Sequence, residues 1–262
     1  MTRQRLKDVA SLARRKGRLV HGEFLVEGVR SVEAAVAAGA PLVEVLVSRE
    51  AEADGRVAAL VGRAGVPVHR LSARDLDRVG DARTSQGVVA VARSVVGADL
   101  GALGPGGAAA GGAVLALDGV QDPGNVGGMV RTAAWFGVVA VVADEKTADF
   151  EAPKAVRASM GGLWDVALVR LPALAPALAA LADGGRALWG ADLDGTPVAA
   201  WSPGGRAVLV MGSEGHGPSP AVADLLRRRG GTVYVPGGAG RGGVESLNVG
   251  VAAGVLLAAW RG

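Results

Sequence analysis

The sequence predicts an α/β protein whose larger, C-terminal part is built on a parallel sheet. Five runs after residue 112 are continuously apolar and rich in valine, which is typical of parallel strands covered on both faces. Helical patterns separate these runs, as the crossovers of a parallel sheet require. A break in composition at residues 97–112 separates this part from a smaller one that also alternates strands and helices. We therefore expect a small α/β domain followed by a parallel-sheet domain.

The smaller part covers residues 1–96. Its strands are expected at 24–28, 42–48, 66–71 and 87–93, and its helices at 4–16, 28–38, 51–64 and 72–79. Ser72, followed three residues later by Asp75, indicates an N-cap with an acidic first turn. The pattern predicts an N-terminal α/β domain with a sheet of its own.

The break holds eight Gly or Pro among residues 97–113 and has no periodicity, which indicates a flexible linker over 97–112. Residues 113–262 form the predicted larger domain. Its strands are expected at 113–120, 138–143, 187–193, 207–212 and 232–236, and its helices at 125–136, 153–160, 173–183, 218–229 and 245–260.

Composition excludes several classes of protein. No run of 18 residues is apolar and free of charge, so a membrane span is not expected. The basic N-terminus has no apolar block behind it, so it does not resemble a signal peptide. The absence of cysteine removes disulfides, thiolate catalysis and zinc–thiolate sites, and it fits a cytoplasmic protein. His21, His69 and His216 are far apart in the chain, so no metal site is expected.

Charge is distributed unevenly along the chain. Residues 1–96 carry 16 basic and 11 acidic residues, whereas residues 97–262 carry 12 and 14. Such asymmetry favours a basic N-terminal module that approaches a polyanion, although a solvated helix face is the simpler alternative. The residues expected to contact the phosphates of such a polyanion are Arg3, Arg5, Lys7, Arg14, Arg15, Lys16, Arg18 and Arg30. No aromatic platform for stacking bases is evident in the sequence.

Three polar, glycine-rich segments each follow a predicted strand of the larger domain, where ligands bind in open α/β sheets. The first contains DPGNVGGMVRTAAWFG, in which Asn125 is expected to cap a helix and Arg131 lies six residues further on. Gly127 and Gly128 each cost roughly 1 kcal/mol relative to alanine in a helix. Two such residues indicate that a ligand or another backbone comes close. The alternative for Arg131 is an ion pair on a solvated face.

The second and third segments are also rich in polar groups. VMGSEGHG places Glu214 at a strand end among exposed amides, with three glycines that permit positive φ angles. The last predicted helix is strongly apolar, yet its first turn holds Glu245, Ser246 and Asn248. Polar residues at a helix start can be caps and nothing more. Three of them beside the other two segments favour a binding site.

A dinucleotide site is the competing interpretation. Gly238, Gly240 and Gly243 satisfy the GxGxxG spacing after a strand and before a helix. That fingerprint also needs a second strand and an acidic residue about 20 positions further on, and the sequence reaches Gly262 first. The GxxxxGK[ST] pattern of a P-loop does not occur. A nucleotide-dependent oxidoreductase is therefore disfavoured.

Taken in order, the stretches DPGNVGGMVRTAAWFG, VMGSEGHG and ESLNVGVAAG resemble the three motifs of the SPOUT superfamily, specifically the TrmH/SpoU-type RNA 2′-O-ribose methyltransferases. VRASMGGLWDV looks like the connecting segment of that family, and HGEFLVEGVRSVEAAVAAG and TSQGVVAVAR look like its N-terminal substrate-binding domain. The resemblance covers nearly the whole chain.

The resemblance implies a deep trefoil knot in the C-terminal domain, a rare exception to unknotted topology. It implies a homodimer and S-adenosylmethionine as methyl donor, with rRNA, 23S rRNA foremost, or tRNA as substrate. By motif position, the polar active-site residues are Asn125, Arg131, Glu214, Ser246 and Asn248. The donor pocket is expected to involve Met211, Gly212, Val235, Ser246, Leu247 and Asn248.

One stretch departs from the family pattern. The loop between Pro236 and Glu245 is about three residues longer than usual, and its glycines at 237–243 are expected to border the donor pocket. Arg131 is expected to stabilise the alkoxide that develops on the ribose, because an arginine with a pKa above about 12 is a reluctant base. A catalytically silent RNA-binding or assembly protein on the same fold remains an alternative.

Overall fold

The computed structural model describes residues 1–80, 85–97, 99–104, 107, 109, 111–238 and 245–261. The chain divides into two compact units. Unit 1 comprises residues 1–95 and 149–165, and unit 2 comprises residues 96–148 and 166–262. Within the described residues, no helix is long and apolar enough to cross a membrane.

Unit 1 is built on a four-stranded sheet in the order β1-β4-β2-β3. β4 pairs antiparallel with both β1 and β2, whereas β2 and β3 are parallel. The strands are β1 (Glu23–Glu27), β2 (Leu42–Ser48), β3 (Val68–Leu71) and β4 (Val88–Arg93). The helices are α1 (Arg3–Ser11), α2 (Arg15–His21), α3 (Val29–Ala37), α4 (Arg49–Glu52), α5 (Gly55–Arg63), α6 (Ala73–Asp77) and α8 (Pro153–Ser159). All four predicted strands of this part are present.

Two predicted helices of unit 1 are each divided in two. The helix expected over 4–16 is α1 and α2, because the chain turns back so closely that a Cβ on Gly17 would lie 2.1 Å from the carbonyl oxygen of Ser11. The helix expected over 51–64 is α4 and α5, separated at Asp54, whose Oδ1 accepts a hydrogen bond from Arg56 N–H at 2.7 Å. The predicted cap at Ser72 is confirmed, since its Oγ accepts from Asp75 N–H at 3.2 Å.

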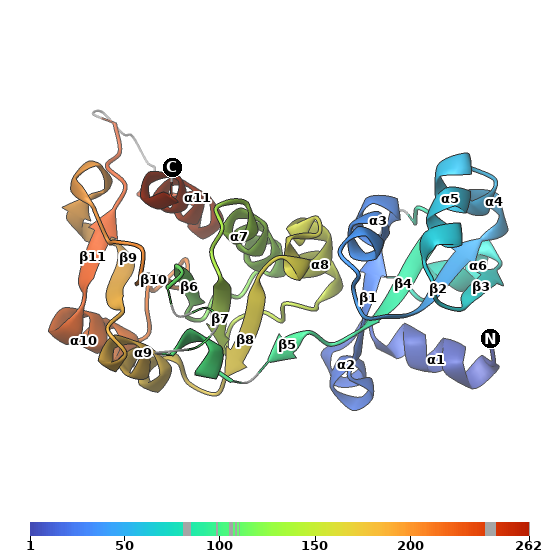
Figure 1. The fold of residues 1–262 in the computed structure, drawn as a ribbon, viewed down its shortest axis with the longest axis horizontal. Helices are drawn as coiled ribbons and strands as arrows, with labels where there is room; N and C mark the ends of the chain where they lie inside the picture. The colour runs from blue at the N-terminus through green and yellow to red at the C-terminus, as the bar shows by residue number, and fades with distance from the viewer. Residues whose placement is uncertain are drawn as a thin grey trace. The chain divides into compact units, whose positions relative to one another are not determined.

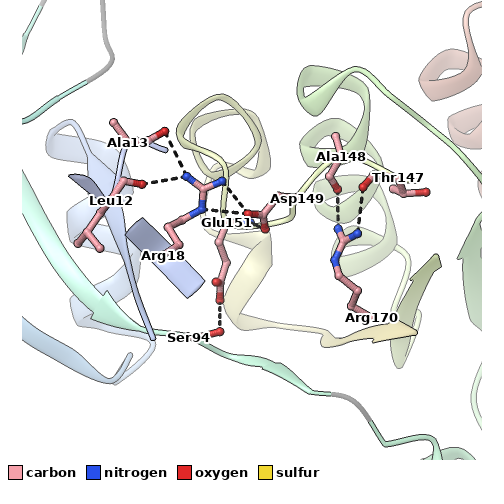
Figure 2. A network of polar contacts seen from close by, with 9 residues as sticks. All are labelled: Leu12, Ala13, Arg18, Ser94, Thr147, Ala148, Asp149, Glu151 and Arg170. Atoms are coloured by element: carbon pink, nitrogen blue, oxygen red, sulfur yellow. Dashed lines mark hydrogen bonds and ion pairs between the residues drawn. The ribbon is translucent and has the colours of Figure 1, made fainter. Parts of the chain in front are cut away.

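Residues 149–165 fold with unit 1 rather than with the domain predicted over 113–262. Arg18 donates to Asp149 Oδ2 from Nε at 2.9 Å and from Nη2 at 2.6 Å (Figure 2). Glu151 Oε1 accepts from the Ser94 hydroxyl at 2.8 Å. Arg157 donates to Glu27 at 2.5 Å, and α8 packs against β1. These contacts join positions that are more than 50 residues apart, so no local pattern could predict them.

Unit 2 is built on a seven-stranded sheet in the order β11-β9-β10-β6-β7-β8-β5, and every pairing in it is parallel. The strands are β5 (Val96–Gly97), β6 (Val114–Leu117), β7 (Ala140–Asp144), β8 (Ala167–Leu171), β9 (Ala187–Pro197), β10 (Ala207–Met211) and β11 (Gly231–Tyr234). The predicted parallel sheet is confirmed. β5 and β8 were not predicted.

Helices cover both faces of this sheet. Figure 1 shows α9 (Leu174–Asp183) and α10 (Pro220–Arg229) on one face, and α7 (Pro123–Trp135) and α11 (Val249–Arg261) on the other. Leucines of α9 and α10 form one core with alternate residues of β6, β7 and β10. α7 and α11 pack against each other. The trefoil knot that the family resemblance implies stays a prediction.

The segment predicted as a flexible linker is held against unit 2 in its described part. Arg186 is 3% exposed and donates to the carbonyl oxygens of Leu103 at 3.2 Å, Ala109 at 2.8 Å and Gly112 at 2.5 Å. Burial lowers the pKa of the Arg186 guanidinium, and the nearby charge of Arg206 lowers it further. Leu103 is itself buried in the core of unit 2. The sequence did not indicate these contacts, because glycine content reflects the freedom of a chain but not the contacts that remove it.

Glu151 makes the stability of unit 1 depend on pH. Its side chain is 6% exposed, and burial raises the pKa of the Glu151 carboxyl above the ordinary value of 4.5. The folded state then binds this proton more tightly than the unfolded state, so the free energy of unfolding falls as pH rises from 4.5 through the raised value. Glu151→Gln keeps the oxygen that accepts from Ser94 and cannot ionise. We predict that the free energy of unfolding of this variant does not fall over this pH range. The variant should therefore be more stable than the wild type at pH 7.

Urea denaturation between about pH 4.5 and 7.5 measures the difference. Glu50→Gln is the matched control, because Glu50 is exposed and forms no side-chain hydrogen bond in the described structure. Equal pH slopes for wild type and Glu151→Gln would contradict the prediction.

Candidate functional site

The site begins where two neighbouring strands of unit 2 end. β6 and β10 are parallel, and Leu117 pairs with Met211 at their last residues, so the loops that follow them start side by side. Asp118 joins these loops: its N–H donates to the Met211 carbonyl oxygen at 2.9 Å, and its buried carboxylate accepts from Ser219 N–H at 2.5 Å. Sequence reasoning missed Asp118, although a carboxylate directly after a buried strand is a usable signal.

The loop after β10 is a closed turn that presents Glu214 to solvent. Ser213 and Gly217 exchange two backbone hydrogen bonds of 3.0 and 2.9 Å. A Cβ on Gly212 would lie 2.2 Å from the Gly217 carbonyl carbon, and Gly217 itself has a φ of +64°. Only glycine allows this close crossing and this backbone conformation. The predicted role of the glycines in shaping the loop therefore has a steric basis in the structure.

A second buried network fixes the loop after β6. Thr147 Oγ1 donates to Asp144 Oδ1 at 2.7 Å and accepts from the N–H groups of Gly119 at 3.0 Å and Val120 at 3.2 Å. Arg170 of β8 in turn donates to the carbonyl oxygens of Thr147 and Ala148 at 2.9 and 2.7 Å, as Figure 2 shows. These contacts hold the chain that leads into α7.

Asn125, Glu214 and Asn248 meet in one hydrogen-bonded cluster, which we call the amide–carboxylate cluster. Glu214 Oε1 accepts from Asn125 Nδ2 at 2.8 Å and from Asn248 Nδ2 at 2.6 Å. Asn248 Nδ2 also lies 3.2 Å from Asn125 Oδ1. The cluster brings together one residue from each of the three polar segments of the sequence. Its members come from positions 89 and 34 residues apart along the chain.

The structure changes the expected helix starts. α7 begins at Pro123 after Asp122, so Asn125 lies in the first turn and is not the N-cap. A proline at the first position is preorganised for a helix start. The helix therefore begins two residues earlier than predicted. α11 begins at Val249, so Glu245 and Ser246 precede the helix. Asn248 is the residue that caps it.

Asn248 therefore has two roles through two different atoms. Its Oδ1 accepts from the N–H groups of Gly250 at 3.0 Å and Val251 at 3.2 Å, which caps α11. Its Nδ2 donates to Glu214. The start of α11 is thus oriented by the loop after β10.

Beside this cluster lies a cavity of about 540 Å³ within unit 2, in the usual range for small-molecule sites. Met211, Gly212, Val235, Ser246 and Leu247, all predicted for the donor pocket, line it. Asn248, also predicted there, is not among the lining residues, and neither are Asn125 and Arg131. The middle of β9 adds Asp192 and Leu193, which sequence reasoning missed because that strand carries no motif. Residues 239–243 of the longer loop lie outside the described residues.

Arg131 stands apart from the amide–carboxylate cluster. It lies on α7, is exposed, and forms no ion pair or side-chain hydrogen bond with any residue that the structure describes. The ion pair that was the alternative for Arg131 is thus not seen in that part of the chain. Nor does the described part contain a group of three His, Asp or Glu residues that could hold a metal ion.

The residues expected to bind RNA fall into two groups. Six are exposed: Arg3, Lys7, Arg14, Arg15, Lys16 and Arg30. Arg5 is engaged by Glu23 at 2.8 Å and Glu44 at 2.6 Å. Arg18 is 6% exposed and bound to Asp149 and to main-chain carbonyls. These two arginines hold unit 1 together and are not free to bind phosphate, which corrects the expectation for them.

The comparisons with known proteins cover both units. The sequence model of the SpoU rRNA methylase family matches residues 112–258, and that of the MRM3-like substrate binding domain matches residues 3–90. A 23S rRNA (guanosine(2553)-2′-O)-methyltransferase, RlmP, of Bacillus subtilis strain 168 is 32% identical over 261 residues, which is 99% of this chain and 96% of the relative.

Solved structures agree along the whole chain. A protein from Porphyromonas gingivalis assigned to the TrmH family of RNA methyltransferases superposes with a TM-score of 0.82 at 32% identity, covering 100% of this chain and 98% of that one. The SpoU methyltransferase AviRb from Streptomyces viridochromogenes, solved with its cofactor AdoMet, also gives a TM-score of 0.82, at 26% identity over 98% of this chain and 97% of that one.

The two roles of Asn248 can be separated by substitution. Asn248→Ala removes both and is predicted to lower the free energy of unfolding by about 1 kcal/mol, the usual value of an N-cap. Asn248→Asp keeps an oxygen that caps α11 but has no N–H group for Glu214. We predict that hydrogen exchange at Gly250 and Val251 is fast in Asn248→Ala and stays protected in Asn248→Asp. Ser246→Ala is the control, since the Ser246 side chain forms no hydrogen bond with the described residues. Equally fast exchange in both Asn248 variants would show that Oδ1 is not the cap.

Proposed function

Because the chain belongs to the SpoU rRNA methylase family, we propose that it methylates the ribose 2′-hydroxyl of a guanosine in 23S rRNA. Its activity is that of an S-adenosylmethionine-dependent RNA 2′-O-methyltransferase. The choice of 23S rRNA and of guanosine rests on the Bacillus relative, whose name states both and which matches 99% of this chain. tRNA is the alternative substrate.

The observation that carries the proposal is the cavity of about 540 Å³ beside the amide–carboxylate cluster. Its chemistry fits the methyl donor. Val235, Leu247 and Leu256 offer apolar surface for an adenine ring, while Ser213, Ser246 and Asp192 offer polar groups for the ribose and the charged amino-acid end. When bound there, S-adenosylmethionine supplies a methyl group on a positively charged sulfur.

The protein's own residues must position the ribose and stabilise its charge. A 2′-hydroxyl becomes a good nucleophile as its proton leaves, and attack requires alignment with the bond that breaks. We assign Arg131 to electrostatic stabilisation of the oxygen as negative charge develops, with an RNA phosphate or solvent accepting the proton. In this reaction the ribose oxygen would gain the methyl group, the carbon–sulfur bond of the donor would break to leave a neutral thioether, and the hydroxyl proton would be released. Asn125, Glu214 and Asn248 order the loops around the donor, and Ser246 lines the cavity beside them.

We further propose that the protein is a homodimer in which Arg131 serves the partner's site. Arg131 lies outside the lining of its own cavity and contacts no described partner through an ion pair or side-chain hydrogen bond. α7 and α11 pack together, and each leaves apolar side chains exposed: Trp135 at 84%, Val251 at 54% and Val255 at 38%. A second copy that covered these residues would bury apolar surface that a monomer leaves in water.

RNA is proposed to approach unit 1 along α1 and α2. The residues in and beside these helices that are basic and exposed are Arg3, Lys7, Arg14, Arg15 and Lys16. Phosphate contacts of this kind position RNA without reading its sequence.

Arg131→Ala is predicted to lower the rate of methyl transfer to 23S rRNA about 100- to 1,000-fold, the usual cost of removing a donor that stabilises a developing oxyanion. Titration calorimetry should show normal affinity for S-adenosylmethionine, because Arg131 does not line the cavity. The rate of methyl transfer by Arg131→Lys should fall between those of Arg131→Ala and the wild type. Lysine keeps the positive charge but lacks the planar guanidinium group. Arg227→Ala, on an exposed face of α10, is the control. Full turnover by Arg131→Ala would remove the assigned role.

Mixing variants tests the dimer. If Arg131 acts in the partner's site and Glu214 in its own, a heterodimer of Arg131→Ala with Glu214→Ala contains one intact site and one with both defects. Statistical mixing then restores roughly a quarter of the wild-type activity. If both residues act within one subunit, mixing restores none.

The salt dependence of RNA binding tests the face on α1 and α2. Replacing Arg14, Arg15 and Lys16 together by alanine is predicted to weaken RNA binding and to reduce the slope of log affinity against log salt by about 0.7 to 0.9 for each phosphate interaction that these side chains make. The control replaces Arg49, Arg63 and Arg74, exposed arginines on other helices of unit 1, and leaves the slope unchanged. Equal slopes for the first variant and wild type would place the phosphate interactions elsewhere.

A further inference from the structure

Unit 1 contains a cavity of its own, of about 610 Å³, which the proposed mechanism does not use. It lies at the start of α3, where β1 ends and β4 begins. Val29, Val57, Val88 and Met160 give it an apolar lining. Its volume is in the range of small-molecule sites.

Polar groups with unused hydrogen-bonding capacity face this cavity. Ser31 lines it, is 7% exposed, and its hydroxyl forms no hydrogen bond with any described residue. Ser31 is a buried residue whose hydroxyl has no partner in the described part of the chain, so the hydroxyl is available to pair with whatever enters the cavity. Gln86 accepts from Val29 N–H at 2.9 Å through Oε1, which leaves its Nε2 group free to donate.

The backbone holds Gln86 in this position. Gly28 has a φ of +90°, and a Cβ there would lie 3.0 Å from Gln86 Oε1. Glycine therefore allows the Gln86 side chain to lie against the first turn of α3. The arrangement is thus built into the backbone between β1 and α3.

The charges that line the cavity are balanced, so a ligand that carries charge over its whole surface is not favoured. Its lining holds three arginines and three carboxylates, namely Arg30, Arg56, Arg157, Glu27, Asp54 and Asp77. Arg157 is bound to Glu27 at 2.5 Å, and Arg56 to Glu33 at 2.6 Å. Arg30 is exposed and forms no ion pair with the described residues, so it is the cation available at the rim. A ligand that fits this cavity is therefore uncharged where it contacts the apolar lining and anionic where it contacts Arg30.

We infer that this cavity binds one unpaired nucleotide of the substrate RNA, with the base against the apolar lining and Ser31, and the phosphate against Arg30. A paired base is not accessible in this way, because single-stranded nucleotides are the ones whose edges and faces proteins reach. The cavity would supply the base contact that the basic residues of α1 and α2 cannot. The inference rests on the proposed function only in taking RNA as the substrate.

The test uses the full-length protein and a transcript of 23S rRNA, with Ser31→Leu to fill the cavity. We expect roughly ten-fold weaker binding, because the base loses its contacts with the lining and with the Ser31 hydroxyl. The salt slope should be unchanged, because no ionic interaction is removed. Arg30→Ala should weaken binding and reduce the slope by about 0.7 to 0.9. A fully paired RNA of the same length should bind Ser31→Leu and wild type equally. Arg49→Ala is the matched control, since Arg49 is exposed on α4 and does not line the cavity.

Each alternative result would overturn the inference. Wild-type affinity of Ser31→Leu for the transcript would show that the cavity is not used, and equal losses of affinity on paired RNA or in Arg49→Ala would show a nonspecific effect. If Ser31→Leu unfolds at lower temperature, Gln86→Ala, at an exposed side chain, repeats the test. Methyl transfer separates this inference from the proposed function: Ser31→Leu should raise KM for the transcript and leave kcat unchanged. A wild type that binds the transcript but transfers no methyl group would overturn the proposed function and leave the binding test intact.

Discussion

The carboxylate of Glu214 accepts hydrogen bonds from Asn125 and Asn248, and through them it joins the starts of α7 and α11 to the loop after β10. A parallel sheet makes this contact possible, because β6 and β10 end side by side and send their following loops in the same direction. Three residues that line the cavity lie within two positions of Asn248 in the chain, namely Ser246, Leu247 and Val249. The shape of this cavity therefore depends on the Glu214 carboxylate, through its hydrogen bond to Asn248.

The sequence predicted the parts of this site that local chemistry determines. Valine-rich strands, the glycines around Glu214 and the three polar segments are visible in the printed chain, because buried parallel strands and tight turns restrict residue types. β8 was missed because Arg170 interrupts an otherwise apolar run, and that arginine serves to bind main-chain carbonyls beside the site. Helix starts were misplaced where several residues could act as caps, since only the fold decides which of them reaches a free N–H group.

Arginines show most clearly which contacts the sequence could not predict. Counting basic residues treated Arg5, Arg18 and Arg30 alike, yet the first two are engaged by carboxylates of unit 1 and only the third is unpaired among the described residues. The guanidinium group offers five donors in a fixed plane, which suit carboxylates and carbonyls within a protein as well as phosphates. Which partner an arginine finds depends on what the fold brings within about 3 Å, and no spacing rule contains that information.

Residues 149–165 tie the two units together through the chain itself. They leave unit 2 after β7 and return to it before β8, so the chain passes between the units three times rather than once. Within unit 1, Asp149 neutralises the buried Arg18, Arg157 binds the buried Glu27, and Trp164 stacks on Phe24 with ring centroids 5.8 Å apart. Cutting the chain near residue 96 would leave these side chains without their partners on both fragments, at the cost of unpaired charges and an exposed aromatic surface. The N-terminal part is thus not a removable attachment. The substrate-binding unit is completed by a segment of the chain that also connects two strands of the methyltransferase sheet.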